Sequence, residues 1–320
     1  MSPATLVLPK LSPGETVVSL IDLGTNSVRM DVVALKGRSA RRLHREKRMV
    51  RLGDGLYENG HLDPLAIERV DHALADLAYL HQAYAVSRVS AVATAAMREA
   101  PEAPALLKDW EARHAIAFRV ISGEEEARLI AKGVLGQERL PSGGFALIDI
   151  GGGSTELSLC QGAKVLESFS LPLGANRLQQ AHLKAVPPRR GGVEALRDAA
   201  KAALAPLHGQ HRWPAVKELI GSGGTIRALR RLAKAAGAKE LPFTTHFLSE
   251  LCQRIQRLDR VGLLHVPGMD EKRVDLLLAG ALVLDETALA LGAQKIRATE
   301  ATLRDGLLAE EIERLNGREK

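Results

Sequence analysis

One short pattern occurs twice in this chain, 127 residues apart. "SLIDLGTNSVRM" covers residues 19–30 and "ALIDIGGGSTEL" covers residues 146–157. In each copy an apolar segment runs to an aspartate, passes through a turn rich in Gly and Ser, and resumes as a second apolar segment. This pattern predicts a β-hairpin. Two copies predict two related domains, each of which opens with the same hairpin.

The remaining chain alternates between strand-like and helix-like segments, which indicates an α/β protein. Residues 117–135 are expected to form a strand, a turn at Gly123 and a helix that begins with three glutamates. Residues 86–100 are expected to form a strand followed by a turn. Apolar residues at helical spacing predict three further helices, the first with Asp63 as its N-cap. These helices are expected within residues 63–84, 191–207 and 273–292.

A third glycine-rich stretch, residues 218–237, is expected to form a strand, a loop and a helix. The P-loop pattern GxxxxGK[ST] is absent from the chain. Ile226 stands where the dinucleotide-binding fingerprint requires its third glycine, which argues against a Rossmann-type oxidoreductase. Glycines at the start of a helix still suit an anion, because the backbone N–H groups there are free.

The charge balance is modestly positive, with 44 basic and 38 acidic side chains. Residues 36–51 concentrate this charge, with eight Lys or Arg in one short stretch. A positive surface can attract an anionic partner, although it can also serve only solubility. Aromatic residues do not interleave with these cations, so a specific nucleic acid partner is not expected. A phosphorylated substrate fits as well.

The cysteines, the histidines, the N-terminal segment and the longest apolar run give further expectations about metal binding and cellular location. Cys160 and Cys252 lack metal-ligand spacing and are expected to be buried structural thiols, and two cysteines in so long a chain favour the cytoplasm. The ten histidines show neither triad nor metal spacing. Residues 1–16 do not resemble a signal peptide and are expected to be a disordered leader. The apolar run 276–284 is too short to span a membrane.

Seven motifs in order give the chain a recognisable pattern. The two hairpin motifs are joined by "VATAAMREA" (92–100), "VISGEEEARL" (120–129), "LIGSGGTIRAL" (219–229), "DLLLAGALVL" (275–284) and "TLRDGLL" (302–308). Over roughly residues 17–310 the chain resembles the exopolyphosphatase / guanosine pentaphosphate phosphatase family of the actin, Hsp70 and sugar-kinase superfamily.

The resemblance implies two ribonuclease-H-like domains that flank a cleft. We expect one domain from residues 1–134 plus 301–320 and the other from residues 135–300. Larger family members carry further helical domains. This chain runs to Lys320 without a His-Asp dipeptide, so the short two-domain form is expected.

The implied activity is hydrolysis of a terminal phosphoanhydride, dependent on Mg²⁺ or Mn²⁺. Inorganic polyphosphate and pppGpp both remain candidate substrates. The alternatives are a phosphotransferase of the same superfamily, such as a sugar kinase, and a non-catalytic regulator that binds polyphosphate or nucleotide. A cytoplasmic protein without a membrane partner is expected, and a homodimer is compatible with the resemblance.

The resemblance also implies catalytic residues. Glu126 would polarise the attacking water, with Glu125 as the alternative, although three glutamates at a helix start also suit the helix dipole. Arg98 would bind phosphate, unless it forms a surface ion pair with Glu99 or Glu102. The metal would be held by Asp149, Asp22 or Glu156, since Mg²⁺ prefers one or two carboxylates with waters and substrate phosphates. Hydrogen bonds within turns are the structural alternative for these acids.

The residues implied for phosphate binding lie in the two hairpin turns, in the third glycine loop and in the basic stretch. The hairpin turns could instead be tight turns with no ligand, and the basic stretch could be a solvated surface. These residues are Gly24, Thr25, Asn26, Ser27, Arg48, Arg51, Gly151, Gly152, Gly153, Ser154, Thr155, Gly223, Gly224 and Thr225.

Overall fold

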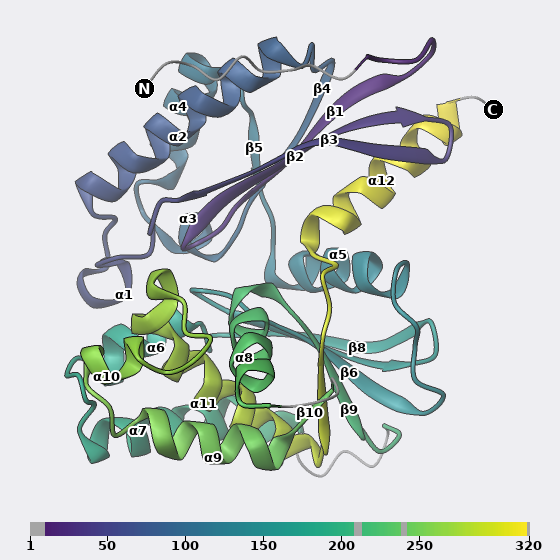
Figure 1. Cartoon of the computed structure of the whole chain (residues 1–320). Coiled ribbons are helices and arrows are strands. Elements are labelled where there is room, and N and C mark those ends of the chain that lie inside the picture. The colour runs from purple at the N-terminus through teal and green to yellow at the C-terminus, as the bar shows by residue number, and fades with distance from the viewer. Residues whose placement is uncertain (1–9, 208–212, 238–241, 319–320) are drawn as a thin grey trace.

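The computed structural model describes residues 10–207, 213–237 and 242–318. Most of the leader expected at residues 1–16 therefore lies outside the described residues. Two β-sheets lie one above the other, with helices on their outer sides and α5 (Gly123–Leu135) and α12 (Leu303–Arg318) near the junction between them (Figure 1).

The first sheet has the strand order β3-β2-β1-β4-β5. Its first three strands form an antiparallel meander, and β4 and β5 continue parallel to β1. These strands are β1 (Thr16–Leu23), β2 (Ser27–Lys36), β3 (Ser39–Met49), β4 (Arg88–Ala93) and β5 (Phe118–Val120).

The second sheet repeats this topology with the order β8-β7-β6-β9-β11 and adds β10 at its edge. The meander is again antiparallel, and β9 and β11 again run parallel to the first strand. These strands are β6 (Gly144–Ile150), β7 (Thr155–Gln161), β8 (Lys164–Leu171), β9 (Glu218–Ser222), β10 (Phe243–Thr244) and β11 (Lys295–Ala298). The predicted fold class, α/β with two ribonuclease-H-like units, is confirmed.

The helices predicted from the sequence are confirmed, and residues 95–99 form a short helix where only a turn was expected. The sequence analysis did not predict several further helices, among them residues 103–114, 245–255 and 303–318. The first long helix has Pro64 in its first turn, and the Asp63 carboxylate accepts the Leu65 N–H at 2.7 Å, as the sequence predicted. The helices are α1 (Leu56–Asn59), α2 (Pro64–Ala83), α3 (Ala95–Glu99), α4 (Ala103–His114), α5, α6 (Ala175–His182), α7 (Arg190–Leu204), α8 (Gly223–Ala235), α9 (Thr245–Ile255), α10 (Arg260–Leu264), α11 (Val274–Leu291) and α12, with 3-10 turns at Ala205–Leu207 and Glu271–Arg273.

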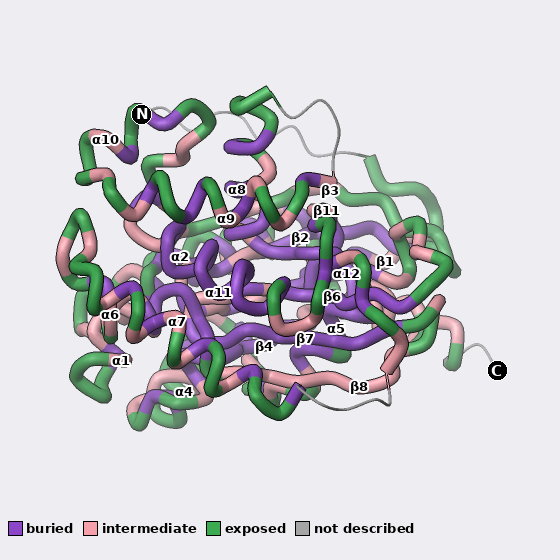
Figure 2. Tube along the Cα trace, turned by 90° about the horizontal axis from the view of Figure 1, so that it is seen from below, coloured by how far each residue is buried: buried purple, intermediate pink, exposed green. Residues whose placement is uncertain are grey.

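A shared apolar cluster connects the two sheets. It includes Leu20 of β1, Leu129 of α5, Phe145 of β6 and Leu307 of α12, all of which are buried. Figure 2 shows buried chain running continuously through the centre of the molecule. Because α5 packs against the second sheet, α12 against the first, and the two helices against each other, they connect the halves on this side. The division at residues 134/135 and 300/301 stays a prediction.

The remaining global expectations concern thiols and membranes. Cys160 and Cys252 are both buried, and burial raises the pKa of the Cys160 thiol to about 12. Within the described ranges no helix is long and apolar enough to cross a bilayer. Most of the basic stretch, residues 39–49, forms β3, an edge strand of the first sheet.

Helices α5 and α12 approach closely because each presents a glycine at the crossing. A Cβ added at Gly306 would lie 2.0 Å from the Leu129 carbonyl oxygen, and one added at Gly133 would lie 2.6 Å from the Thr302 carbonyl oxygen. Both neighbours are backbone atoms that cannot rotate away. The crossing therefore requires glycine at both positions.

We expect Gly306→Ala to lower the free energy of unfolding by about 2–3 kcal/mol, since overpacking a tight contact forces the helices apart. Gly317→Ala is the matched control, because Gly317 lies exposed on the same helix with open space around its Cα. That change should be neutral or stabilising by up to about 1 kcal/mol. Chemical denaturation measures both variants, and equal effects would contradict the proposed crossing.

Candidate active site

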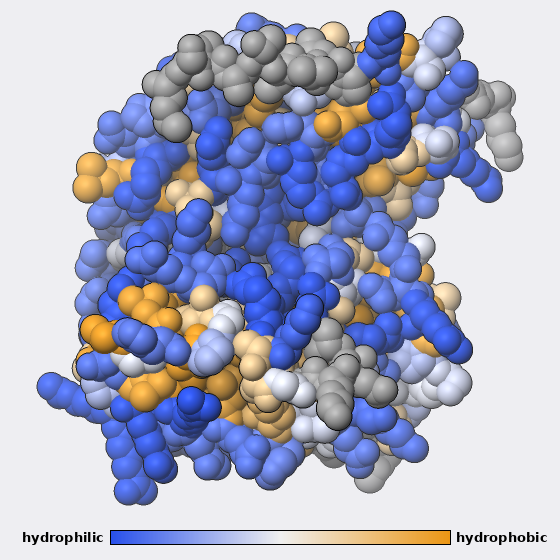
Figure 3. All heavy atoms as spheres, viewed as in Figure 1, coloured by the Kyte–Doolittle hydropathy of each residue, from blue (hydrophilic) through white to orange (hydrophobic). Residues whose placement is uncertain are grey.

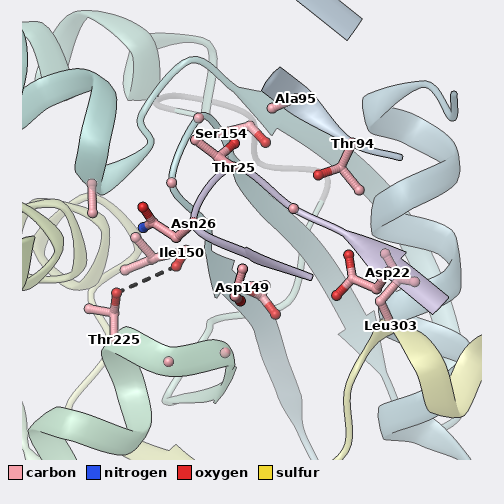
Figure 4. A pocket seen from close by; sticks show the side chains of 18 of the residues that line it. Asp22, Thr25, Asn26, Thr94, Ala95, Asp149, Ile150, Ser154, Thr225 and Leu303 are labelled. Atoms are coloured by element: carbon pink, nitrogen blue, oxygen red, sulfur yellow. Dashed lines mark hydrogen bonds between the residues drawn. The ribbon is translucent and has the colours of Figure 1, made fainter. Parts of the chain in front are cut away.

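A cavity lies between the two sheets, where the turns of both hairpins meet (Figure 4). On the face shown in Figure 3, hydrophilic side chains predominate across the middle of the molecule. The residues that line the cavity are Asp22, Gly24, Thr25, Asn26, Ser27, Arg29, Thr94, Ala95, Glu126, Ile130, Asp149, Ile150, Gly151, Gly152, Gly153, Ser154, Ala175, Gly223, Gly224, Thr225, Arg273, Leu276, Leu277, Thr302 and Leu303.

The two hairpins have the same turn geometry. The Gly24 N–H donates to the Ser27 carbonyl at 3.1 Å, and the Gly151 N–H donates to the Ser154 carbonyl at 2.9 Å. Each turn follows a strand whose next-to-last residue is an aspartate that lines the cavity. The aligned sequence motifs therefore form structurally equivalent loops.

The glycines of the second turn also have a packing role. A Cβ added at Gly152 would lie 2.8 Å from the Thr25 Cβ, and one added at Gly153 would lie 2.7 Å from the Ala95 Cβ. The second turn thus packs directly against the first half of the molecule. Glycine is required here by close contact, whatever ligand the N–H groups bind.

Asp22 and Asp149 occupy equivalent positions and both direct carboxylates into the cavity (Figure 4). Asp149 accepts a hydrogen bond from the Ser222 hydroxyl. Burial raises the pKa of Asp22, while the positive charges of Arg304 and Arg29 oppose this shift. The Arg304 Nη1 atom lies 3.7 Å from the Asp22 carboxylate.

These two aspartates fit a hard divalent cation, because Mg²⁺ takes carboxylate oxygens and completes its shell with water and phosphate. Within the described parts of the chain, no three His, Cys, Asp or Glu side chains form a metal cluster. Glu156 does not line the cavity: it is buried and accepts a hydrogen bond from the Ser170 hydroxyl at 2.9 Å. Burial raises the pKa of Glu156 to about 7.

Glu126 is the one glutamate of its helix turn that faces the cavity. Glu124 is exposed, and Glu125 forms an ion pair with Arg119 on the surface. Burial raises the pKa of Glu126, and the neighbouring negative charge of Glu156 raises it further. A carboxylate with a raised pKa in a cleft is suited to accept a proton from water near neutral pH.

Arg98 lies beside Glu126. Its Nη1 atom is 3.3 Å from the Glu126 carboxylate and donates to the Ile121 carbonyl at 2.9 Å. The positive charge opposes the rise in the pKa of Glu126. Arg98 therefore pairs with the candidate base, where the sequence offered Glu99 or Glu102 as the alternative partners.

Two cations that the sequence analysis did not single out line the cavity. Arg29 is the cross-strand neighbour of Asp22, and burial lowers its pKa to about 10, so it stays protonated near neutral pH. Alignment of the two hairpins could have found it, since Arg29 stands where the second copy has Glu156. Arg273 packs against the third loop: a Cβ at Gly224 would lie 1.8 Å from its Nη2 atom. No spacing in the sequence links these two residues.

Five predicted residues lie outside the cavity lining: Glu156 and Arg98, described above, and Arg48, Arg51 and Thr155. The Arg48 guanidinium is 3.2 Å from the Asp76 carboxylate, on the side of the sheet that α2 covers. Arg51 forms ion pairs with Asp54 at 3.5 Å and with Asp275 at 3.7 Å. The buried Thr155 hydroxyl donates to a carbonyl oxygen at 2.7 Å.

The fold and the cavity define a class. Two ribonuclease-H-like units with their hairpin turns facing across a cleft characterise actin-like proteins. Residues 32–315 match the model of the Ppx/GppA phosphatase family, and the chain belongs to that family. The predicted family and the prediction of a phosphate-releasing enzyme are confirmed.

Named relatives agree with this membership. Exopolyphosphatase 2 of Mycobacterium tuberculosis is 32% identical over 312 residues, which cover 91% of this chain and 97% of that protein. The crystal structure of the Aquifex aeolicus Ppx/GppA family member superposes with a TM-score of 0.76 at 25% identity, covering 94% of this chain and 99% of that one. An exopolyphosphatase structure from Cytophaga hutchinsonii has the same fold, with a TM-score of 0.84 at 23% identity, covering 93% of this chain and 98% of that one.

We expect Arg29→Gln to weaken tripolyphosphate binding about tenfold, because a hydrogen bond to a charged group contributes about 1.5–3 kcal/mol. Arg48→Gln removes the same charge from the opposite face of the same sheet and should change binding less than about twofold, since exposed ion pairs contribute little. Titration calorimetry measures both. A larger loss at Arg48 would contradict the arrangement described here.

Proposed function

We propose that this protein is an exopolyphosphatase that hydrolyses the terminal phosphoanhydride of inorganic polyphosphate and releases orthophosphate. The observation that carries this proposal is the buried carboxylate of Glu126, which lines one cavity together with the turns of both hairpins. Family membership and the relative named exopolyphosphatase 2 support it. The guanosine pentaphosphate pppGpp is a second candidate substrate, because it also ends in a phosphoanhydride.

Phosphate binding would use the backbone of both turns and the cations beside them. Turn residues such as Gly152 and Asn26 present N–H groups, and Arg29 and Arg273 supply positive charge at the cavity wall. The transferring phosphoryl group carries spread negative charge, so fixed donors of this kind stabilise the transition state.

Glu126 would accept the proton of the attacking water. Its pKa is raised by burial, and Arg98 holds the carboxylate in place. Asp149 and Asp22 would hold Mg²⁺ or Mn²⁺, which neutralises phosphate oxygens when bound. The product phosphate then leaves through the open side of the cavity.

The proposal also includes the expected domain bounds, cellular location and oligomeric state. The two units, residues 1–134 with 301–320 and residues 135–300, would enclose the substrate between them. Two buried thiols suit a cytoplasmic location. A homodimer stays a prediction that sedimentation can measure. The comparisons give no support to a sugar kinase or a non-catalytic regulator, and release of free phosphate without an acceptor distinguishes hydrolysis from both.

We expect Glu126→Ala to lower kcat for phosphate release from long-chain polyphosphate by about 10²–10⁴, the usual contribution of a general base. Substrate binding should remain. Glu124→Ala is the matched control, since Glu124 lies exposed on the same helical turn. Its rate should be unchanged. Comparable activity of wild type and Glu126→Ala would refute the role of Glu126, and a comparison of polyphosphate, pppGpp and ATP as substrates would define the preferred one.

Metal removal provides an independent test. EDTA should abolish phosphate release, and added Mg²⁺ should restore it. Asp149→Asn should raise the Mg²⁺ concentration needed for half-maximal rate, because an amide is a weaker ligand than a carboxylate. Rates unaffected by EDTA would contradict a metal at these aspartates.

A further inference from the structure

The peptide carbonyls of the second glycine turn all point toward α6. The Gly151 oxygen accepts the Ala175 N–H at 2.9 Å, and the Gly152 oxygen accepts the Asn176 N–H at 2.9 Å. The Gly153 oxygen instead accepts a side-chain donor, Nε of Arg177, at 2.8 Å. Two of the three carbonyls are thus held by backbone and the third by a single side chain.

These contacts fix the direction of the N–H groups. In a planar trans peptide the C=O and the following N–H point in opposite directions. The N–H groups of Gly152, Gly153 and Ser154 therefore point away from α6. None of the three donates to an acceptor among the described residues, and all three residues line the cavity. Consecutive N–H groups with this geometry form an anion-binding concavity.

The first turn achieves a similar arrangement with backbone donors. The Thr25 oxygen accepts the Gly53 N–H at 2.9 Å, and the Asn26 oxygen accepts the N–H groups of Val50 and Arg51 at 3.1 and 3.0 Å. The peptide between Gly153 and Ser154 differs, because its direction depends on Arg177. A substitution can therefore change it.

Arg177 is itself held by the first half of the molecule. Its guanidinium lies 4.2 Å from the centroid of the Tyr57 ring, and its Nη2 atom lies 2.6 Å from a Glu99 carboxylate oxygen. The Tyr57 hydroxyl also presses on the turn, since a Cβ at Gly153 would lie 2.0 Å from it. Glu99 directly follows Arg98, the partner of Glu126.

We propose that Arg177 is a positioning residue that turns the Gly153–Ser154 peptide so that the Ser154 N–H faces the transferring phosphate. Because Tyr57 and Glu99 hold the guanidinium, the N–H is aligned only when the two halves are together. This inference rests on the proposed function. An N–H aimed at developing phosphate charge contributes more in the transition state than in the ground state, so it acts on kcat.

The test compares phosphate release from polyphosphate by wild type and three variants. Arg177→Met keeps an apolar stem on the Tyr57 ring but loses every donor, whereas Arg177→Lys keeps one donor. Lys184→Gln is the matched control: Lys184 also bridges the halves, with its Nζ 2.7 Å from the Glu58 carboxylate, but does not touch the turn. Thermal unfolding of each variant separates folding from function.

We expect Arg177→Met to lower kcat at least about tenfold with KM changed less than about threefold, given that loss of one fixed oxyanion donor costs about 10²–10³. Arg177→Lys should lose less, and Lys184→Gln should match wild type. An unchanged kcat in Arg177→Met, a rise in KM alone, or an equal loss in Lys184→Gln would overturn the assignment. Wild-type protein that releases no phosphate would refute the proposed function instead.

Discussion

The site depends on one close contact, the packing of the second glycine turn on the Thr25 side chain of the first turn. That contact leaves no space for a Cβ at Gly152. It brings together two loops that are more than a hundred residues apart in sequence, and with them the aspartates that precede each loop. The turn residues of both halves that line the cavity take their positions from this contact.

Helix α5 provides the second constraint. It places Glu126 at its first turn and Gly133 near its end, so one rigid element connects the candidate base to the crossing with α12. The carboxylate is buried because the helix is clamped between the two sheets. Its raised pKa is thus a consequence of how the halves are packed and of the acidic neighbour Glu156. The packing of α5 that stabilises the fold therefore also raises the pKa of the candidate base.

Much of the fold could be predicted from local patterns. The duplicated hairpin, the capped helix after Asp63 and the glycine loop before α8 are all encoded by short-range spacing, and all appear where expected. The cavity residues of the hairpin turns follow from the same repeat. Only the resemblance favoured Glu126 over Glu125. Neighbouring glutamates on one helical turn point in different directions, and the sequence does not say which direction faces the cavity.

The misses have a physical cause as well. Arg48 belongs to a basic strand whose successive side chains point to opposite faces, and sequence alone does not say which face meets the cavity. Arg273 and Arg177 reach the site from distant elements, so their roles exist only in the folded molecule. Short helix α3 was missed because five residues carry too little periodicity to reveal it.

Arg29 and Glu156 stand at the same place in two copies of one hairpin and carry opposite charges. The two sheets share one strand topology, but the charges at equivalent positions differ. Arg29 lines the cavity, whereas Glu156 is buried outside its lining. Of the two equivalent positions, only the first therefore brings its charge to the cavity wall, and a polyanion in the cleft meets two sides of unequal charge.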